Sequence, residues 1–407
     1  MVQEEAEQIR ARIQLLRAFT PGAPVNRKEF FAGRLKQLSQ VLQAVSQPGQ
    51  HAVVFGERGV GKTSLAGLVH AFWEEAAKDF VLAVRINCNP QDGFGTIWAK
   101  VAEEMSVLLE KRNFPGVTTA FRDAVDRLVN GEATPNLVRR CFQLSDHVSI
   151  IVLDEFDRLE DRDALGLIAD TIKALSDHWV LNVTLVLVGV ADAVDDLIEE
   201  HASIDRALAQ VLVPRMARAE VSQIVTKGLD SVGMTIKPSA LNTITELSQG
   251  LPYYAHLLGL QSATTALSDK QMEVGDNHVV GGVLEALDNA VESIIAAYHQ
   301  ATISPRRDSL YKQVLLSCAL APVDDLGYFA PADIARPLSK VMKKTYRIPA
   351  FIRHLSELTK ETHGKVLQKT GAPHKQRYRF TNPLLKPFVV MKSIQDKLIS
   401  PEHLFGV

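Results

Sequence analysis

The segment Gly-Glu-Arg-Gly-Val-Gly-Lys-Thr-Ser at 56–64, directly after the apolar run 51–55, constrains the fold of this 407-residue chain more than any other feature. It matches the pattern G-x-x-x-x-G-K-[ST]. The glycines let successive backbone N–H groups point at phosphate oxygens, and the helix starting near Gly61 adds its positive end. Lys62 can reach the β- and γ-phosphates, and the Thr63 hydroxyl can ligate Mg²⁺. The alternative is a glycine-rich turn with an exposed lysine. The predicted phosphate-binding residues are Gly56, Glu57, Arg58, Gly59, Val60, Gly61, Lys62, Thr63 and Ser64.

A second acidic motif lies at 149–157, where Ser-Ile-Ile-Val-Leu-Asp-Glu-Phe-Asp reads as an apolar strand that ends in carboxylates. Carboxylates there are costly to bury unless a cation is near, and Mg²⁺ beside the phosphate loop would supply one. We expect Asp154 to hold Mg²⁺ through water and Glu155 to polarise a water for attack on the γ-phosphate. The alternative is that these residues only end a strand. For Asp157 the structural and functional interpretations have equal weight.

Short apolar segments alternate with helical segments in the first half of the chain. Near-continuous Val, Ile and Leu content is typical of parallel strands that are covered on both faces. The alternation predicts an α/β fold with a doubly wound parallel sheet. Two helices, about 3–18 and 34–46, precede the expected strands at 51–55, 80–87, 148–153, 181–188 and 209–213.

After Pro214 the sequence predicts helices and no further strands until the C-terminal region. Three helices followed by two short strands is the order of a winged helix. We therefore expect an N-terminal helical segment at 1–48, a P-loop core at 49–215, a helical lid at 216–303 and a winged-helix domain at 304–407. The expected lid helices are 217–232, 238–248, 252–267 and 278–300, and the winged helix consists of helices 308–320, 331–343 and 347–360 and strands 365–369 and 375–381.

The charge of the chain is unevenly distributed. Residues 301–407 hold 18 Lys and Arg against 8 Asp and Glu, a balance of +10, whereas residues 1–300 hold 27 against 39, a balance of −12. A basic C-terminal domain on an acidic body predicts contact with a polyanion, here double-stranded DNA. The alternative is a protein-docking domain whose charges are solvated. The residues expected to contact DNA are Lys343, Lys344, Arg347, Arg353, Lys375 and Arg377.

The two phosphate motifs, 56–63 and 150–157, resemble those of the AAA+ and STAND families of P-loop ATPases. The chain is most similar to the branch that includes archaeal origin-recognition initiators, over about 30–260 and more loosely in its C-terminal part. The resemblance implies ATP and Mg²⁺ as cofactors. It also implies an extra strand between the two motif strands, a place that 181–188 could fill, and an upstream box at 31–34, with Arg34, that covers adenine.

Four further positions take their roles only from this resemblance. Asn87 is similar to the polar residue that restrains the catalytic Glu, and Pro252, in Gly-Leu-Pro at 250–252, to the lid proline that touches the nucleotide. Arg206 would be the arginine finger, acting on a neighbouring subunit in a homo-oligomer, with Arg215 as a rival. The family's polar γ-phosphate sensor is missing after 181–188, where Asp192 is a candidate substitute, so hydrolysis is expected to be slow.

Other classes of protein find no support in the sequence. It holds no apolar stretch long enough for a membrane span and no N-terminal secretion pattern. Cys88, Cys141 and Cys318 lie far apart, which suits a reducing cytoplasm. Hydrolase triads and metalloenzyme motifs are absent from the sequence.

We expect an ATP-hydrolysing oligomeric switch that acts on DNA in replication, transposition or defence. The alternative is a nucleotide-gated scaffold that binds a partner protein; a small-molecule kinase fits the lid and basic domain less well.

Overall fold

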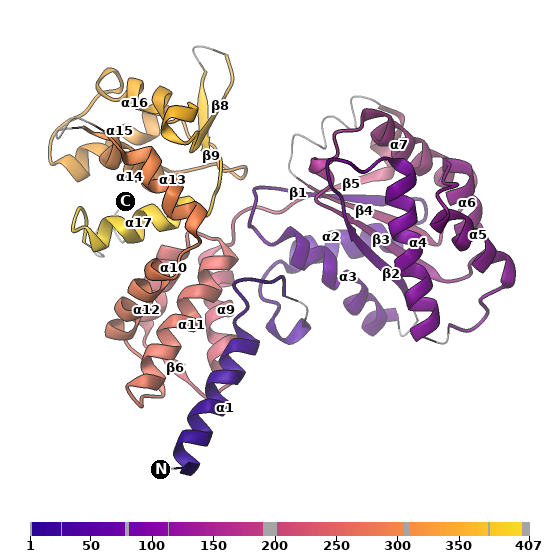
Figure 1. Ribbon diagram of the computed structural model, residues 1–407, viewed down its shortest axis with the longest axis horizontal. Helices are drawn as coiled ribbons and strands as arrows, with labels where there is room; N and C mark the ends of the chain where they lie inside the picture. The colour runs from indigo at the N-terminus through magenta and orange to yellow at the C-terminus, as the bar shows by residue number, and fades with distance from the viewer. Residues whose placement is uncertain are drawn as a thin grey trace.

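The computed structural model describes residues 2–25, 27–77, 81–112, 114–189, 202–304, 309–372 and 375–400. Figure 1 shows three units: a sheet with flanking helices on the right, a helical unit at the lower left and a C-terminal unit above it. Helix α1 (Val2–Ala18) lies against α9 and α11 of the helical unit, whereas α2 (Leu35–Ser46) packs on the sheet. The N-terminal segment expected at 1–48 is therefore divided between two units.

The central sheet has five parallel strands in the order β2-β3-β4-β1-β5. Strand β4 lies between the strands that carry the two phosphate motifs, which confirms the extra strand expected near 181–188. The α/β doubly wound fold is confirmed as well. The strands are β1 (His51–Phe55), β2 (Val81–Asn87), β3 (Val148–Asp154), β4 (Val183–Gly189) and β5 (Leu208–Leu212).

Both faces of the sheet are largely buried because its strands are mainly apolar. Val54 and Val152 pack on one face, against α2 and α3 (Lys62–Ala77). Val53 and Ile151 pack on the other. This alternation follows from the two-residue period of a strand. The second face is covered by α4 (Phe94–Lys111), α5 (Thr119–Val129), α6 (Pro135–Gln143) and α7 (Arg162–Asp177).

The helical unit differs from the sequence prediction in two respects. The helix expected at 278–300 is two helices, because Asn289 ends the first and its side chain donates to Glu285 O at 2.9 Å. The prediction of helices alone is also wrong, since β6 (Thr235–Ile236) pairs with β7 (Glu273–Val274); strands of two residues leave no periodic pattern. The helices are α9 (Arg218–Asp230), α10 (Pro238–Ser248), α11 (Pro252–Ser268), α12 (Asp276–Asp288) and α13 (Glu292–Thr302).

The C-terminal unit has the helix and hairpin order of a winged helix. The expected helix 347–360 is shorter than predicted, because Pro349 lies in a 3-10 turn and Phe351 has a non-helical φ of −130°. Tyr378 and Phe380 of the hairpin are buried, as their alternation with arginines predicts. Helix α17 was not predicted. The elements are α14 (Tyr311–Leu320), α15 (Pro331–Met342), α16 (Ile352–Glu357), β8 (Leu367–Thr370), β9 (Arg377–Phe380) and α17 (Leu385–Gln395).

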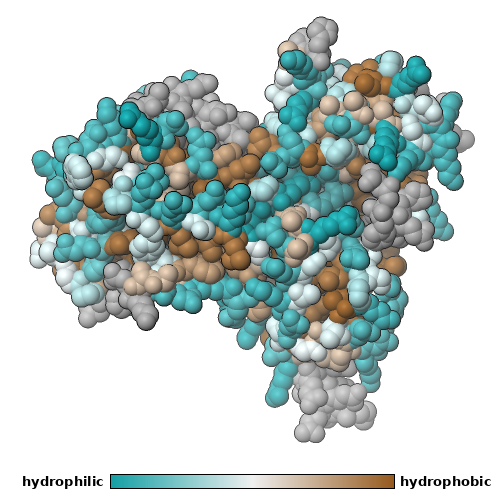
Figure 2. All heavy atoms as spheres, turned by 180° about the vertical axis from the view of Figure 1, so that it is seen from behind, coloured by the Kyte–Doolittle hydropathy of each residue, from teal (hydrophilic) through white to brown (hydrophobic). Residues whose placement is uncertain are grey.

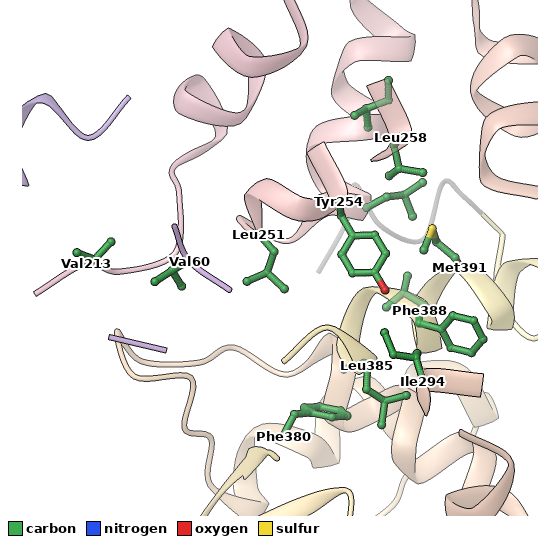
Figure 3. Close-up of a cluster of buried hydrophobic side chains, with 14 of the residues drawn as sticks. Val60, Val213, Leu251, Tyr254, Leu258, Ile294, Phe380, Leu385, Phe388 and Met391 are labelled. Carbon is green, nitrogen blue, oxygen red and sulfur yellow. The ribbon is translucent and has the colours of Figure 1, made fainter. Parts of the chain in front are cut away.

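One apolar cluster joins the three units. It runs from the α2 and α3 face of the sheet through the helical unit into the C-terminal unit. Figure 3 shows Tyr254 of α11 with its hydroxyl pointing toward α17, where Leu385 and Phe388 lie. This hydroxyl donates to Leu384 O at 2.7 Å. On the face shown in Figure 2, hydrophilic residues surround several smaller apolar patches. The apolar interior that the three units share holds them together.

Candidate nucleotide-binding site

The phosphate loop joins β1 to α3, and its glycines are required by its geometry. Gly56 has a φ of +152°, and a Cβ there would overlap the carbonyl oxygen of Val213. Gly61 has a φ of +98° at the start of α3. Lys62 Nζ donates to the carbonyl oxygens of Gly56 and Glu57, both at 3.0 Å. The lysine amine is therefore held over the loop, as phosphate binding requires.

The two phosphate motifs meet at the carboxyl edge of the sheet. Thr63 Oγ1 lies 3.3 Å from Asp154 Oδ1 and donates to it. Burial raises the pKa of Asp154, although the bonds donated by the Glu155 backbone N–H and by Thr63 act against it. Burial likewise lowers the pKa of Lys62, opposed by Asp157 and Asp154. The Asp154 carboxylate and the Thr63 hydroxyl are oxygen ligands of the kind that Mg²⁺ binds, and the cation would stabilise the buried carboxylate in its charged form.

Glu155 does not stand free in the structure. Its backbone is left-handed, with a φ of +54°, and its carboxylate accepts a hydrogen bond from Arg158 Nη1 at 2.8 Å. Both side chains line the same cavity as Lys62 and Thr63. The sequence analysis did not single out Arg158, although the spacing of three residues from Glu155 is a signal for such a pair.

Asp157 covers the position where the family's polar sensor is missing. Gly189 ends β4, and a Cβ on it would lie 3.1 Å from Asp157 Oδ1. The carboxylate therefore takes the space that a side chain at Gly189 would need. Asp157 also lines the cavity, which favours the functional interpretation of this residue. The candidate substitute, Asp192, lies outside the described residues.

A cavity of about 840 Å³ opens above the phosphate loop. Three of the predicted loop residues, Gly56, Glu57 and Val60, do not line this cavity. Gly56 lies against Val213, Val60 is buried, and Glu57 faces the C-terminal unit. The predicted residues that the structure brings together around this cavity are Arg58, Gly59, Gly61, Lys62, Thr63, Ser64, Asp154, Glu155 and Pro252.

Residues 20–25 also line the cavity, although the sequence analysis assigned them no role. Val25 N–H donates to Ser64 Oγ at 3.1 Å, and Thr20 N–H donates to His256 Nδ1 at 3.3 Å. Burial lowers the pKa of His256 to about 4, so this imidazole is neutral at pH 7. The available sequence signal was the run Pro-Gly-Ala-Pro at 21–24, in which each proline fixes its own backbone φ.

The Arg34 side chain lies outside the cavity in which its expected role would place it. Its side chain is 4% exposed and does not line the cavity. One of its terminal nitrogens, Nη2, donates to Val60 O at 3.1 Å and to Pro214 O at 2.5 Å. Arg34 thus contacts the backbone of the phosphate loop and of the segment after β5, and the role of the box at 31–34 in covering adenine stays a prediction.

The two candidate arginine fingers have different surroundings. Arg206 is exposed on a 3-10 turn (Ala202–Ala207) before β5 and does not line the cavity of its own chain. Arg215 is bound to Glu57 through two contacts, at 2.7 and 2.8 Å, and donates to Gln249 O. Arg215 is thus occupied within its own chain, which leaves Arg206 as the candidate to reach a neighbouring subunit.

The helical unit and the C-terminal unit each place one residue near the phosphate loop, and a third residue, Asn87, lies at the end of a strand of the sheet. Pro252 begins α11, and its Cγ would lie 3.6 Å from a Cβ on Gly61. Leu384 of the C-terminal unit would contact a Cβ on Gly59 at the same distance. Asn87 ends β2 in register with Asp154 on β3. Both distant units thus have a residue next to the loop.

The six residues expected to contact DNA lie on the surface of the C-terminal unit. All of them are exposed, but Arg377 also forms an ion pair of 2.6 Å with Asp324. Arg377 and Arg379 both lie over the ring of Tyr328. The hairpin is therefore less basic than its sequence predicts. The exposed set comprises Lys343, Lys344, Arg347, Arg353, Lys375 and Arg377.

The fold and the site together define a P-loop NTPase. The chain matches the profile of the family described as Novel STAND NTPase 1 over residues 16–324, which is most of its length, and it belongs to that family. The resemblance to AAA+ and STAND P-loop ATPases is thereby confirmed. A comparison with curated proteins finds no match.

Solved structures share this fold. A Walker-type ATPase of Pyrococcus abyssi has 16% identity and a TM-score of 0.54, with 91% of this chain and 99% of that chain covered. The ORC2 protein of Aeropyrum pernix, solved as ADPNP–ADP complexes, has 14% identity and a TM-score of 0.53, with 94% and 98% covered. Among the described residues, no helix has the length and apolar character needed to cross a membrane.

Proposed function

We propose that this protein binds ATP with Mg²⁺ and hydrolyses it, and that nucleotide state controls its assembly on DNA. The observation that carries the proposal is the contact between Thr63 and Asp154, which brings the two phosphate motifs together. The shared fold with a protein solved as ADPNP–ADP complexes supports an adenine nucleotide as the ligand. Its base would lie between residues 20–25 and the lid residue Pro252, both of which line the cavity.

We assign each catalytic role to a residue of this protein. Lys62 would bind the β- and γ-phosphates, and Thr63 and Asp154 would hold Mg²⁺, which neutralises phosphate charge when bound. Glu155 would accept a proton from the attacking water. Because Arg158 occupies its carboxylate, hydrolysis would be slow until this pair opens. Arg206 of a neighbouring subunit would stabilise the charge that develops on the transferring phosphoryl group.

Each unit has its own proposed role. Residues 49–215 are the P-loop core, 216–303 the helical lid and 304–407 a DNA-binding winged helix, and residues 1–48 join core and lid. DNA contact would come from the exposed Lys343, Lys344, Arg347 and Arg353, since each phosphate contact releases counterions. A homo-oligomer in the cytoplasm, acting in replication, transposition or defence, completes the proposal.

A second function is favoured by one observation. Arg377 is neutralised by Asp324, so the hairpin offers less charge to DNA than the sequence implies. A nucleotide-gated scaffold whose winged helix binds a partner protein would need no such charge.

The deciding experiment measures the size of the protein with and without ATP and duplex DNA, at low and moderate salt. A DNA complex that requires ATP and dissociates as salt rises supports the first function. Salt-insensitive binding of a co-purifying protein supports the second. A particle whose size responds to none of these additions refutes the nucleotide-dependent switch.

A further inference from the structure

A second cavity, of about 860 Å³, lies between the helical unit and the C-terminal unit. Arg215 and Gln249 line it on one side, and Ala321, Arg336 and Lys386 line it on the other. It shares no lining residue with the cavity above the phosphate loop. Its volume is within the range of pockets that bind small molecules.

The lining of this cavity is rich in positive charge. It holds four cations, Arg215, Arg218, Arg336 and Lys386, against the two carboxylates of Glu246 and Asp333. Both carboxylates are engaged. Glu246 forms an ion pair with Arg218, and Asp333 accepts a hydrogen bond of 2.7 Å from the Ala330 backbone N–H at the start of α15.

Lys386 is the least compensated of these cations. The residue is 5% exposed, and its Nζ donates to Ala321 O at 3.4 Å. Glu57, the nearest acidic partner, gives both carboxylate oxygens to Arg215. A buried ammonium group without its own anion is costly, because it loses hydration that nothing replaces.

The titration of Lys386 agrees with this charge deficit. The pKa of Lys386 is lowered to about 7, first by burial and then by the charge of Arg215, whereas Glu57 and the Cys318 thiol act in the opposite direction. A bound anion would favour the protonated amine. Anion binding should therefore take up a proton and weaken as the pH rises above 7.

We propose that this cavity is a second ligand site, which binds a small phosphate-bearing anion through Lys386 and Arg336. Phosphate suits this lining because it accepts several charge-assisted hydrogen bonds at once. The Gln249 side-chain oxygen is buried without a hydrogen-bond partner among the described residues, and it offers an acceptor to an N–H or O–H group of the ligand.

The site lies next to the nucleotide cavity through the start of α17. Leu384 lines the nucleotide cavity and accepts the hydrogen bond from Tyr254, whereas Lys386, two residues later, lines the second cavity. A ligand that draws Lys386 into the second cavity would move Leu384 against the phosphate loop. Occupancy of the two sites should be coupled, and by linkage the coupling acts equally in both directions.

The test is a calorimetric titration with inorganic pyrophosphate and, separately, with AMP. Binding should persist in Lys62→Ala, which weakens the phosphate loop, and should fall at least tenfold in Lys386→Met. Methionine fills the same buried space without charge, and Arg336→Met provides a second variant at the exposed rim. Lys173→Met, at an exposed position of α7 outside both cavities, serves as the matched control and should leave pyrophosphate binding unchanged.

The two probes distinguish the source of the phosphate. Tighter AMP binding identifies a phosphate carried by an organic molecule, and tighter pyrophosphate binding identifies a free one; either result supports the site. Binding of neither probe to Lys62→Ala would overturn the proposal, as would binding that Lys386→Met and Arg336→Met leave intact. Because the titration is made in Lys62→Ala, its outcome is independent of whether the phosphate loop hydrolyses ATP.

Discussion

Arg215 contacts both carboxylate oxygens of Glu57, through Nε at 2.7 Å and Nη2 at 2.8 Å, with both side chains largely buried. Glu57 belongs to the phosphate loop, and Arg215 lies where the chain leaves the sheet for the helical unit. Arg215 also donates to Gln249 O of the helical unit. On the other side of the pair, a Cβ on Gly327 of the C-terminal unit would lie 2.6 Å from Glu57 Oε1. All three units thus meet at one ion pair.

Removing one partner of this pair should destabilise the protein strongly. Arg215→Met leaves the Glu57 carboxylate buried and unpaired, which costs roughly 3 kcal/mol or more. Lys28→Met is the matched control, because its pair with Glu75 is at the surface and should contribute much less to stability. Chemical denaturation measures both losses. Equal losses in the two variants would contradict a structural role for the buried pair.

Glu155 and Arg158 should have opposite effects on turnover. Glu155→Gln should retain ATP binding while steady-state hydrolysis falls by a factor of about 100 or more, since the proton acceptor is lost. Arg158→Met should raise hydrolysis severalfold, because the contact of 2.8 Å with Arg158 occupies the Glu155 carboxylate that must accept the proton. A fall in turnover in Arg158→Met would show that Arg158 itself acts on the nucleotide.

Two buried histidines should make stability depend on pH. Burial lowers the pKa of His51 and of His256 to about 4, below the ordinary value of 6.5. Between pH 4 and 6.5 the unfolded chain therefore binds more protons than the folded chain, and the free energy of unfolding falls as the pH drops through this window. Each histidine should contribute up to about 1.4 kcal/mol per pH unit.

A single substitution isolates one of these contributions. His51 Nδ1 accepts a hydrogen bond of 2.9 Å from the Leu185 backbone N–H, and the Asn side-chain oxygen in His51→Asn can replace this acceptor. Denaturation curves from pH 7 to 5 should then show a slope smaller by about one proton. An unchanged slope would mean that His51 does not titrate on unfolding.

The basic surface of the C-terminal unit should show its contribution in salt dependence. Arg347 is exposed, so Arg347→Ala should reduce the slope of log affinity for duplex DNA against log salt by about one. Arg377 is already paired with Asp324, so Arg377→Ala should change the slope less. Fluorescence anisotropy at several salt concentrations measures both slopes. Equal slopes in the wild type and both variants would favour the protein-binding alternative.

The sheet and the phosphate motifs were predictable because their signals are local. A glycine loop after an apolar strand and a strand ending in Asp154 need no long-range information. The apolar segment 181–188 predicted a strand, and its place between the two motif strands followed from the family resemblance. The position of residues 20–25 was not predictable, since it depends on α1 packing against α9 and α11 far along the chain. The contacts of Arg34 were not predictable for the same reason: its partners, Val60 O and Pro214 O, become neighbours only in the folded chain.

The central claim, that a nucleotide and Mg²⁺ are bound between the phosphate loop and Asp154, is tested most directly by the Mg²⁺ dependence of ATP affinity. Calorimetry should show that Mg²⁺ strengthens ATP binding to the wild type, and that Asp154→Asn removes this gain while the affinity without Mg²⁺ persists. Lys62→Ala should weaken binding under both conditions. A gain from Mg²⁺ that remains unchanged in Asp154→Asn would contradict the claim.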